Sequence, residues 1–165
     1  MKHILSLETN EATLDLVGGK GQSLVRMTRA GFDVPGGFYL TTTAYRSFVE
    51  SNDLQSKIIE LAKPEIGKFS LSFDVAAESI QALIGKPKLQ EEMVDEIRAA
   101  YAALDGDNPA VAVRSSANAE DLPDMSFAGQ QDTYLNIRGE DALLAAVQNC
   151  WASLWTARAI SYRHQ

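Results

Sequence analysis

The stretch that decides the fold reads VAVRSSANAEDLPDMSFAGQQDTYLNI and covers residues 111–137. The apolar run at 110–113 predicts a buried strand that ends at Arg114. A loop rich in Ser, Asn, Asp and Gly follows as far as Gly129, and the alternating residues 132–137 predict a second strand. A long polar loop that opens on an arginine is therefore expected between two short strands.

Helical periodicity dominates the chain on either side of this stretch. Helices are expected over about 22–30, from the threonines at 41–43 to about 52, in three pieces between 53 and 104, and from 140 to the end of the chain. A further short strand is expected at 38–40. The sequence thus predicts a helix-rich α+β or mixed α/β domain with a small mixed sheet.

Composition and charge limit the class of function. The chain has 165 residues, 45% apolar and 22% charged, which is typical of one folded domain. Its 15 basic and 22 acidic side chains give a net charge of −7 without a basic cluster, which argues against a nucleic-acid partner. No apolar run is long enough for a bilayer and no secretory leader is evident, so we expect a cytoplasmic protein with no membrane partner. The single cysteine, Cys150, excludes an internal disulfide.

The glycine-rich stretch GGKGQS at 18–23 is the first candidate site. Glycines let a backbone approach an anion closely, and the helix behind them would point its free N–H groups toward that anion. Lys20 would add an ammonium group. The stretch does not fit the Walker pattern, because glycine follows the lysine. On these residues alone, a tight turn with a solvated lysine is the alternative.

The segment VRSSA at 113–117 is the second candidate site. The guanidinium of Arg114 suits phosphate, because its planar fork donates two parallel hydrogen bonds. Ser115 and Ser116 offer hydroxyls that would orient the arginine or bind the same oxygens. The alternative is an exposed ion pair between the guanidinium and a nearby carboxylate: Glu120, Asp121 or Asp124.

The loop at 126–133 is the third candidate, since small residues around Gly129 would let it fold over a phosphate. Phe127 would anchor such a flap. The alternative is an ordinary loop with Phe127 buried in the core, and we expect the core position for this side chain. No metal ligand is assigned, because adjacent carboxylates beside a proline are more often a solvated turn. Neither histidine has a neighbouring triad or metal spacing, and the two tryptophans have the spacing of core or interface residues: His3, His164, Trp151 and Trp155.

Four ordered blocks carry a resemblance to a known family. They are LVGGKGQSLVRM (16–27), VPGGFYLTTTAYRSFV (34–49), the stretch at 111–137 and CWASLWTARAISYR (150–163). Together they resemble the N-terminal nucleotide-binding domain shared by phosphoenolpyruvate synthase, pyruvate phosphate dikinase and the rifampicin phosphotransferases. The resemblance implies the first subdomain of an ATP-grasp-like fold, in which two subdomains hold ATP between them.

The resemblance also implies roles for particular residues. Lys20 and Arg114 match the cations that contact the phosphates of ATP and act in catalysis. Ser115, Gly129 and Thr133 match positions at the nucleotide. The Mg²⁺ ligands of the family are expected in a second subdomain beyond Gln165.

By the same resemblance, residues 1–165 are expected to be part of a longer enzyme and inactive alone. That enzyme would transfer the β-phosphoryl group of ATP to a histidine in another domain and then to pyruvate. A rifampicin-type antibiotic as acceptor is the alternative enzyme, and a non-catalytic nucleotide-binding module is the alternative of another class. Exposed apolar surface is expected where the other subdomain would pack, which predicts self-association of this piece.

Overall fold

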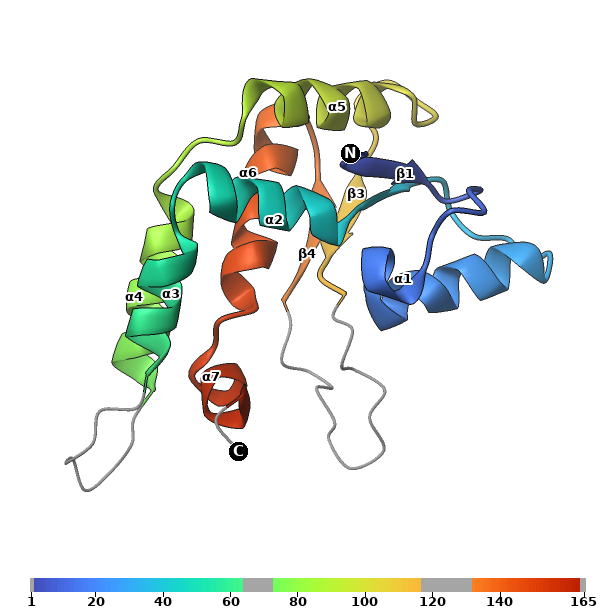
Figure 1. Ribbon diagram of the computed structural model, residues 1–165. Helices are drawn as coiled ribbons and strands as arrows, with labels where there is room; N and C mark the ends of the chain where they lie inside the picture. The colour runs from blue at the N-terminus through green and yellow to red at the C-terminus, as the bar shows by residue number, and fades with distance from the viewer. Residues whose placement is uncertain (1, 64–72, 117–131, 164–165) are drawn as a thin grey trace.

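The computed structural model of the chain describes residues 2–63, 73–116 and 132–163 (Figure 1). The elements described are β1 (Ile4–Ser6), α1 (Leu14–Arg29), β2 (Phe38–Leu40), α2 (Thr42–Ser51), α3 (Gln55–Ala62), α4 (Asp74–Gly85), α5 (Glu91–Ala102), β3 (Val111–Arg114), β4 (Thr133–Ile137), α6 (Glu140–Ser153) and α7 (Ala157–Arg163). They confirm a helix-rich α+β domain. None of the described helices has the length and apolar character needed to cross a membrane.

The strands form two separate antiparallel pairs. In the first pair, β1 lies beside β2 with Leu5 opposite Tyr39. In the second, β3 lies beside β4 with Arg114 opposite Thr133, after a register shift near the start of β3. The strands expected at 38–40 and 132–137 are therefore confirmed, and they belong to different sheets.

The strand expected at 110–113 exists as β3, but it is only half buried. Val111 and Val113 are partly buried, whereas Ala112 and Arg114 are exposed. The alternation arises because one face of the β3–β4 pair packs on α6, so successive side chains point toward the helix and away from it. The prediction of a buried strand was wrong because a run of four apolar residues does not distinguish one covered face from two.

The main core lies between the helices. Phe48, Ile80, Met93 and Ile97 are completely buried in it. Trp151 of α6 packs on the Phe48 ring with 5.1 Å between ring centroids, which confirms the expected core position of this tryptophan. Helix α6 packs on α4 and on the β3–β4 pair, so it connects the helical part of the domain to the sheet (Figure 1).

A second, smaller core connects α1 to the β1–β2 pair. Its buried members are Leu5, Ala12, Val17, Val25 and Tyr39. Helix α1 extends from this small core at one side of the domain (Figure 1). The glycine-rich first half of α1 therefore lies close to the strands.

Two helix predictions were wrong in their boundaries. The helix expected to begin at residue 22 begins at Leu14, so the glycines lie inside α1 and not in a turn before it. The single helix expected from residue 140 ends at Ser153, and α7 follows after a short break. The backbone N–H of Ala159 donates to the Thr156 hydroxyl at 3.2 Å, so a threonine inside an apolar stripe starts a new helix.

Several large apolar side chains are exposed on the described surface. They are Leu14, Met27, Phe32, Ile59, Leu61, Val75 and Leu135. They are spread over several elements, so they do not test the expectation of an apolar surface where another subdomain would pack. Self-association of the chain stays a prediction.

Candidate functional site

The glycine-rich stretch is an interruption inside α1. Gly18 has φ 67° and ψ −180°, values that separate two helical segments of this helix. A side chain at Gly18 would have no room, because an added Cβ would lie 2.4 Å from the Ser116 Oγ atom and 2.7 Å from the Ser116 carbonyl carbon. Glycine is therefore required here both for the backbone conformation and for the close approach of a distant segment.

Two hydrogen bonds join this interruption to the end of β3. The Lys20 Nζ atom donates to the Ser115 carbonyl at 3.2 Å. The Gly21 N–H donates to the Ser116 Oγ atom, also at 3.2 Å. The first two candidate sites of the sequence analysis, 95 residues apart in the chain, are thus one site in the fold.

Arg114 and Thr133 lie at the same end of the β3–β4 pair. They are opposite each other in the register, and both are exposed to solvent. Because Ser115 follows Arg114 directly, the Lys20 ammonium and the Arg114 backbone are neighbours. We call residues 18–21, residues 114–116 and Thr133 the cationic junction.

The remaining parts of these predictions lie outside the described residues. These are Phe127 and Gly129 of the third candidate loop, and the carboxylates Glu120, Asp121 and Asp124 that were the alternative partners of Arg114.

Cys150 lies beneath the cationic junction, a position that sequence reasoning missed. The Sγ atom approaches the carbonyl oxygen of Val113 at 3.7 Å and that of Asp132 at 4.0 Å, so it contacts the ends of both strands. Burial, and to a lesser extent the Asp132 carboxylate, raise the pKa of the Cys150 thiol to about 11, although Lys20 and the Ser115 backbone N–H act in the opposite direction. The thiol is therefore protonated at neutral pH and is not a nucleophile there. The only signal in the sequence was its place on the apolar stripe of α6.

His3 contacts a carboxylate of α5 and, among the described residues, hydrogen-bonds to none of those in the cationic junction. It is buried, and its Nδ1 atom lies 2.9 Å from the Glu96 Oε1 atom of α5. His164 lies outside the described residues. Trp155 donates from its Nε1 atom to the Tyr45 hydroxyl at 3.0 Å, so it helps to hold the helices together.

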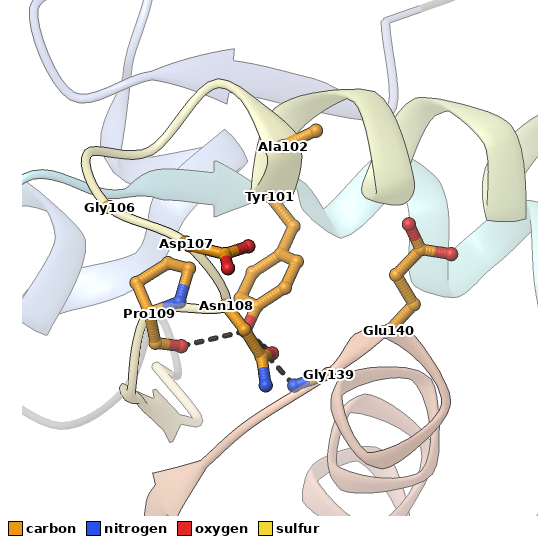
Figure 2. Close-up of a pocket in the computed structure, with 8 residues that line it drawn as sticks. All are labelled: Tyr101, Ala102, Gly106, Asp107, Asn108, Pro109, Gly139 and Glu140. Atoms are coloured by element: carbon orange, nitrogen blue, oxygen red, sulfur yellow. Dashed lines mark hydrogen bonds between the residues drawn. The ribbon is translucent and has the colours of Figure 1, made fainter.

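A surface cavity of about 320 Å³ lies at the other end of the β3–β4 pair (Figure 2). Its lining residues are Tyr101, Ala102, Gly106, Asp107, Asn108, Pro109, Gly139 and Glu140. The cavity does not reach the cationic junction, because residues 108–109 precede β3 and residue 139 follows β4. It carries carboxylates, which do not suit a phosphate.

The cationic junction contains residue types whose chemistry suits a phosphate. A lysine and an arginine lie at one end of the sheet, next to a glycine-rich helical interruption, and the exposed Thr133 offers a hydroxyl. This combination is typical of nucleotide-binding domains.

Comparison with known proteins identifies the family. Residues 14–165 match the family described as pyruvate phosphate dikinase, AMP/ATP-binding domain. The chain therefore belongs to this family of ATP-binding domains.

Phosphoenolpyruvate synthases are among the similar proteins. The synthase of Escherichia coli (strain K12) is 44% identical over 160 residues, which cover 92% of this chain and 20% of the synthase. The synthase of Aeropyrum pernix is 43% identical over 94% of this chain and 20% of its own length. The probable synthase of Methanocaldococcus jannaschii is 44% identical over 100% of this chain and 14% of its own length. The chain thus spans about a fifth or less of these three relatives.

Proposed function

We propose that the cationic junction binds the phosphates of ATP, with Lys20 and Arg114 as the two cations. The observation that carries this proposal is the 3.2 Å hydrogen bond from the Lys20 Nζ atom to the carbonyl of Ser115, the residue after Arg114. This bond puts the Lys20 ammonium beside the backbone of the segment that carries Arg114, which supports a shared role for the two cations. Phosphate oxygens bound between them would be held by charge-assisted hydrogen bonds.

Three further residues have distinct roles in this proposal. Thr133 faces solvent opposite Arg114 and would donate its hydroxyl to a phosphate oxygen. Ser115 is buried, and it acts by holding Lys20 through its carbonyl. Gly129 is proposed at the nucleotide from the family resemblance alone.

We propose that the chain is the ATP-binding part of a longer, phosphoenolpyruvate-synthase-like dikinase. In such an enzyme the β-phosphoryl group of ATP passes to a histidine of another domain and then to pyruvate. Lys20 and Arg114 would stabilise the negative charge on the phosphoryl oxygens during the first transfer. The similar proteins are named phosphoenolpyruvate synthases, which favours pyruvate over an antibiotic as the acceptor. An assay of the longer protein with ATP and either pyruvate or rifampicin separates the two.

The family resemblance implies Mg²⁺, but the described part of the chain does not contain a full set of side chains to bind it. Within residues 2–63, 73–116 and 132–163, no group of three or more His, Cys, Asp or Glu side chains is placed to hold a metal ion. We propose that the metal ligands lie beyond Gln165.

The binding site is tested by titrating the ¹⁵N-labelled chain with ATP and following the amide signals by NMR. The signals of the cationic junction are expected to move, and those of Asn108 and Gly139 are expected to stay. Arg114→Ala and Lys20→Ala should each weaken binding roughly tenfold or more, as expected for the loss of a charge-assisted hydrogen bond. Arg138→Ala is the matched control, because this arginine lies at the opposite end of the same strand pair, where it donates to the Asn108 carbonyl at 3.1 Å.

The outcome of the titration also distinguishes the classes of protein. A dissociation constant well above micromolar is expected, since the second subdomain would supply the rest of the ATP site. Micromolar affinity of the chain alone would favour a self-sufficient nucleotide-binding module. Shifts centred on the cavity of Figure 2, or unchanged binding in both Arg114→Ala and Lys20→Ala, would overturn the proposed site.

A further inference from the structure

We propose that Ser116 is a positioning residue: its hydroxyl caps the interrupted helix α1 from a distant strand and thereby holds Lys20 beside Arg114. This inference rests on the proposed role of Lys20 and Arg114 in phosphate binding. The sequence alone left open whether the Ser116 hydroxyl orients Arg114 or binds phosphate. The contacts of Ser116 assign it a different task.

The first step concerns the start of the second helical segment in α1. Gly18 has non-helical φ and ψ values, and helical geometry resumes at the next residue. Gly18 therefore stands where the N-cap residue of that segment belongs. The first N–H groups of a helical segment lack partners within the helix, and a Ser, Thr, Asp or Asn side chain at the N-cap commonly accepts from the third residue after it. Gly18 has no side chain for this purpose.

The second step is that Ser116 makes this missing bond. Gly21 is the third residue after Gly18, and its N–H donates to the Ser116 Oγ atom at 3.2 Å. The Oγ atom also lies 2.4 Å from the place that a Cβ of residue 18 would occupy. The serine hydroxyl thus fills the position of a local capping side chain. Ser116 supplies the hydroxyl that Gly18, which has no side chain, cannot supply.

The third step connects the cap to Lys20. Residues 20 and 21 are consecutive, and so are their partners 115 and 116, so the two hydrogen bonds form one double attachment between α1 and the end of β3. The attachment limits the rotation of the helical segment relative to the strand. Losing the Ser116 bond would remove one half of this attachment, and the Lys20 ammonium is then expected to lie less often at the end of β3.

The first experiment measures amide hydrogen exchange in the chain without nucleotide. In Ser116→Ala, exchange of the Gly21 amide is expected to rise roughly tenfold, the effect of losing a bond of ordinary capping strength. Exchange of the Gly139 amide, which donates to the Tyr101 hydroxyl at 3.0 Å, should not change. Unchanged exchange at Gly21 would overturn the capping role.

The second experiment is a double-mutant cycle on ATP affinity. Ser116→Ala is expected to weaken ATP binding roughly fivefold in the otherwise unchanged chain, and to have no further effect when Lys20→Ala is already present. An equal loss in both backgrounds would mean that the Ser116 hydroxyl binds phosphate itself, which contradicts the proposal. Circular dichroism at the assay temperature establishes that each variant is folded.

The two proposals fail in different ways in this cycle. If neither Lys20→Ala nor Arg114→Ala weakens ATP binding, the proposed phosphate site is wrong. If both weaken it while Ser116→Ala leaves the affinity unchanged, the phosphate site stands and the positioning role of Ser116 is wrong.

Discussion

The two ends of the β3–β4 pair are joined to neighbouring segments by the same kinds of hydrogen bond but differ in the charged side chains around them. At the cationic junction, the N–H of Gly21 donates to a serine hydroxyl and Lys20 donates to the carbonyl of Ser115. At the other end, the N–H of Gly139 donates to the Tyr101 hydroxyl (Figure 2). The Arg138 side chain donates to the Asn108 carbonyl at the same end. Each end thus has a backbone N–H held by a hydroxyl and a cation held by a carbonyl.

The charged groups differ between the two ends. The cationic junction adds the exposed Arg114 to Lys20, so a phosphate would meet two positive charges. The other end has charges of both signs: the Asp107 and Glu140 carboxylates line its cavity. Arg98 lies 2.9 Å from the Glu140 carboxylate, and Arg138 lies nearby. The comparison teaches that these hydrogen bonds serve to join segments, and that the charge placed around them decides which end suits an anion.

The largest expected effect comes from alanine in place of the glycines at the two ends. Gly18 and Gly139 both have positive φ with extended ψ, a conformation that costs other residues about 1–3 kcal/mol. Gly18→Ala would in addition drive a Cβ to 2.7 Å from the Ser116 carbonyl carbon and oxygen, whereas Gly139 has its nearest neighbour at 3.8 Å. We expect losses of about 2–5 kcal/mol for Gly18→Ala and about 1–3 kcal/mol for Gly139→Ala in denaturant unfolding.

A double variant sharpens this prediction. Ser116→Gly in the Gly18→Ala background should restore little stability, because the backbone atoms of residue 116 remain in the way. Full recovery would show that only the Ser116 hydroxyl, and not the backbone, requires a glycine at residue 18.

The second prediction concerns the hydroxyl at the other end. Tyr101 is buried, accepts from the Gly139 N–H and donates to the Pro109 carbonyl at 2.7 Å. Tyr101→Phe leaves both groups without this partner and is expected to cost about 1–3 kcal/mol in thermal or denaturant unfolding. ATP binding should be unchanged, since this end carries no phosphate site. Weakened ATP binding in a folded Tyr101→Phe chain would break the proposed division between the two ends.

The smallest effect is expected from the buried thiol beneath the cationic junction. The folded state raises the pKa of Cys150 to about 11 from a model-compound value of 9.0, so the folded chain holds the thiol proton more tightly than the unfolded chain does. The resulting stability is present below pH 9 and is lost as the pH rises toward 11.

The corresponding measurement is the melting temperature between pH 8 and pH 11. Cys150→Ser removes the titrating group, so its melting temperature should fall less over this range than that of the unchanged chain. Burial also raises the pKa of Tyr39 and of Tyr134. Both tyrosines are present in the unchanged chain and in Cys150→Ser, so the difference between the two melting curves against pH is due to Cys150. An equal or steeper fall in the variant would contradict the raised pKa of the thiol.

Much of the secondary structure was predictable because it depends on local spacing. Met93 and Ile97 recur at helical intervals in α5, and both are completely buried there. The strands β2, β3 and β4 could be located from their flanking turn residues, whereas β1 was not predicted. Boundaries were less predictable: the glycines lie within the span of α1, where the Gly21 N–H donates to a serine 95 residues away, and no local pattern contains that contact.

The candidate site was predictable only in parts. The glycine-rich stretch and the arginine after a strand each suit phosphate by their chemistry, and each also had an ordinary alternative. The family resemblance predicted that Lys20 and Arg114 act at the same phosphates. In the fold, the hydrogen bond from Lys20 to Ser115 brings their segments together. Cys150 stayed unnoticed, since nothing near it in the chain reports that Val113 and Asp132 would surround its thiol.

The sequence by itself determined the types of element, the charges available and the membership of an ATP-binding family, because propensity, periodicity and motif spacing are properties of neighbouring residues. Only the tertiary structure decided that residues 18–21 meet residues 114–116, that the strands form two sheets, and that carboxylates line a cavity at the end of β3–β4 away from Lys20. Contacts between residues 95 positions apart depend on how the helices and sheets pack, and packing is a property of the whole chain.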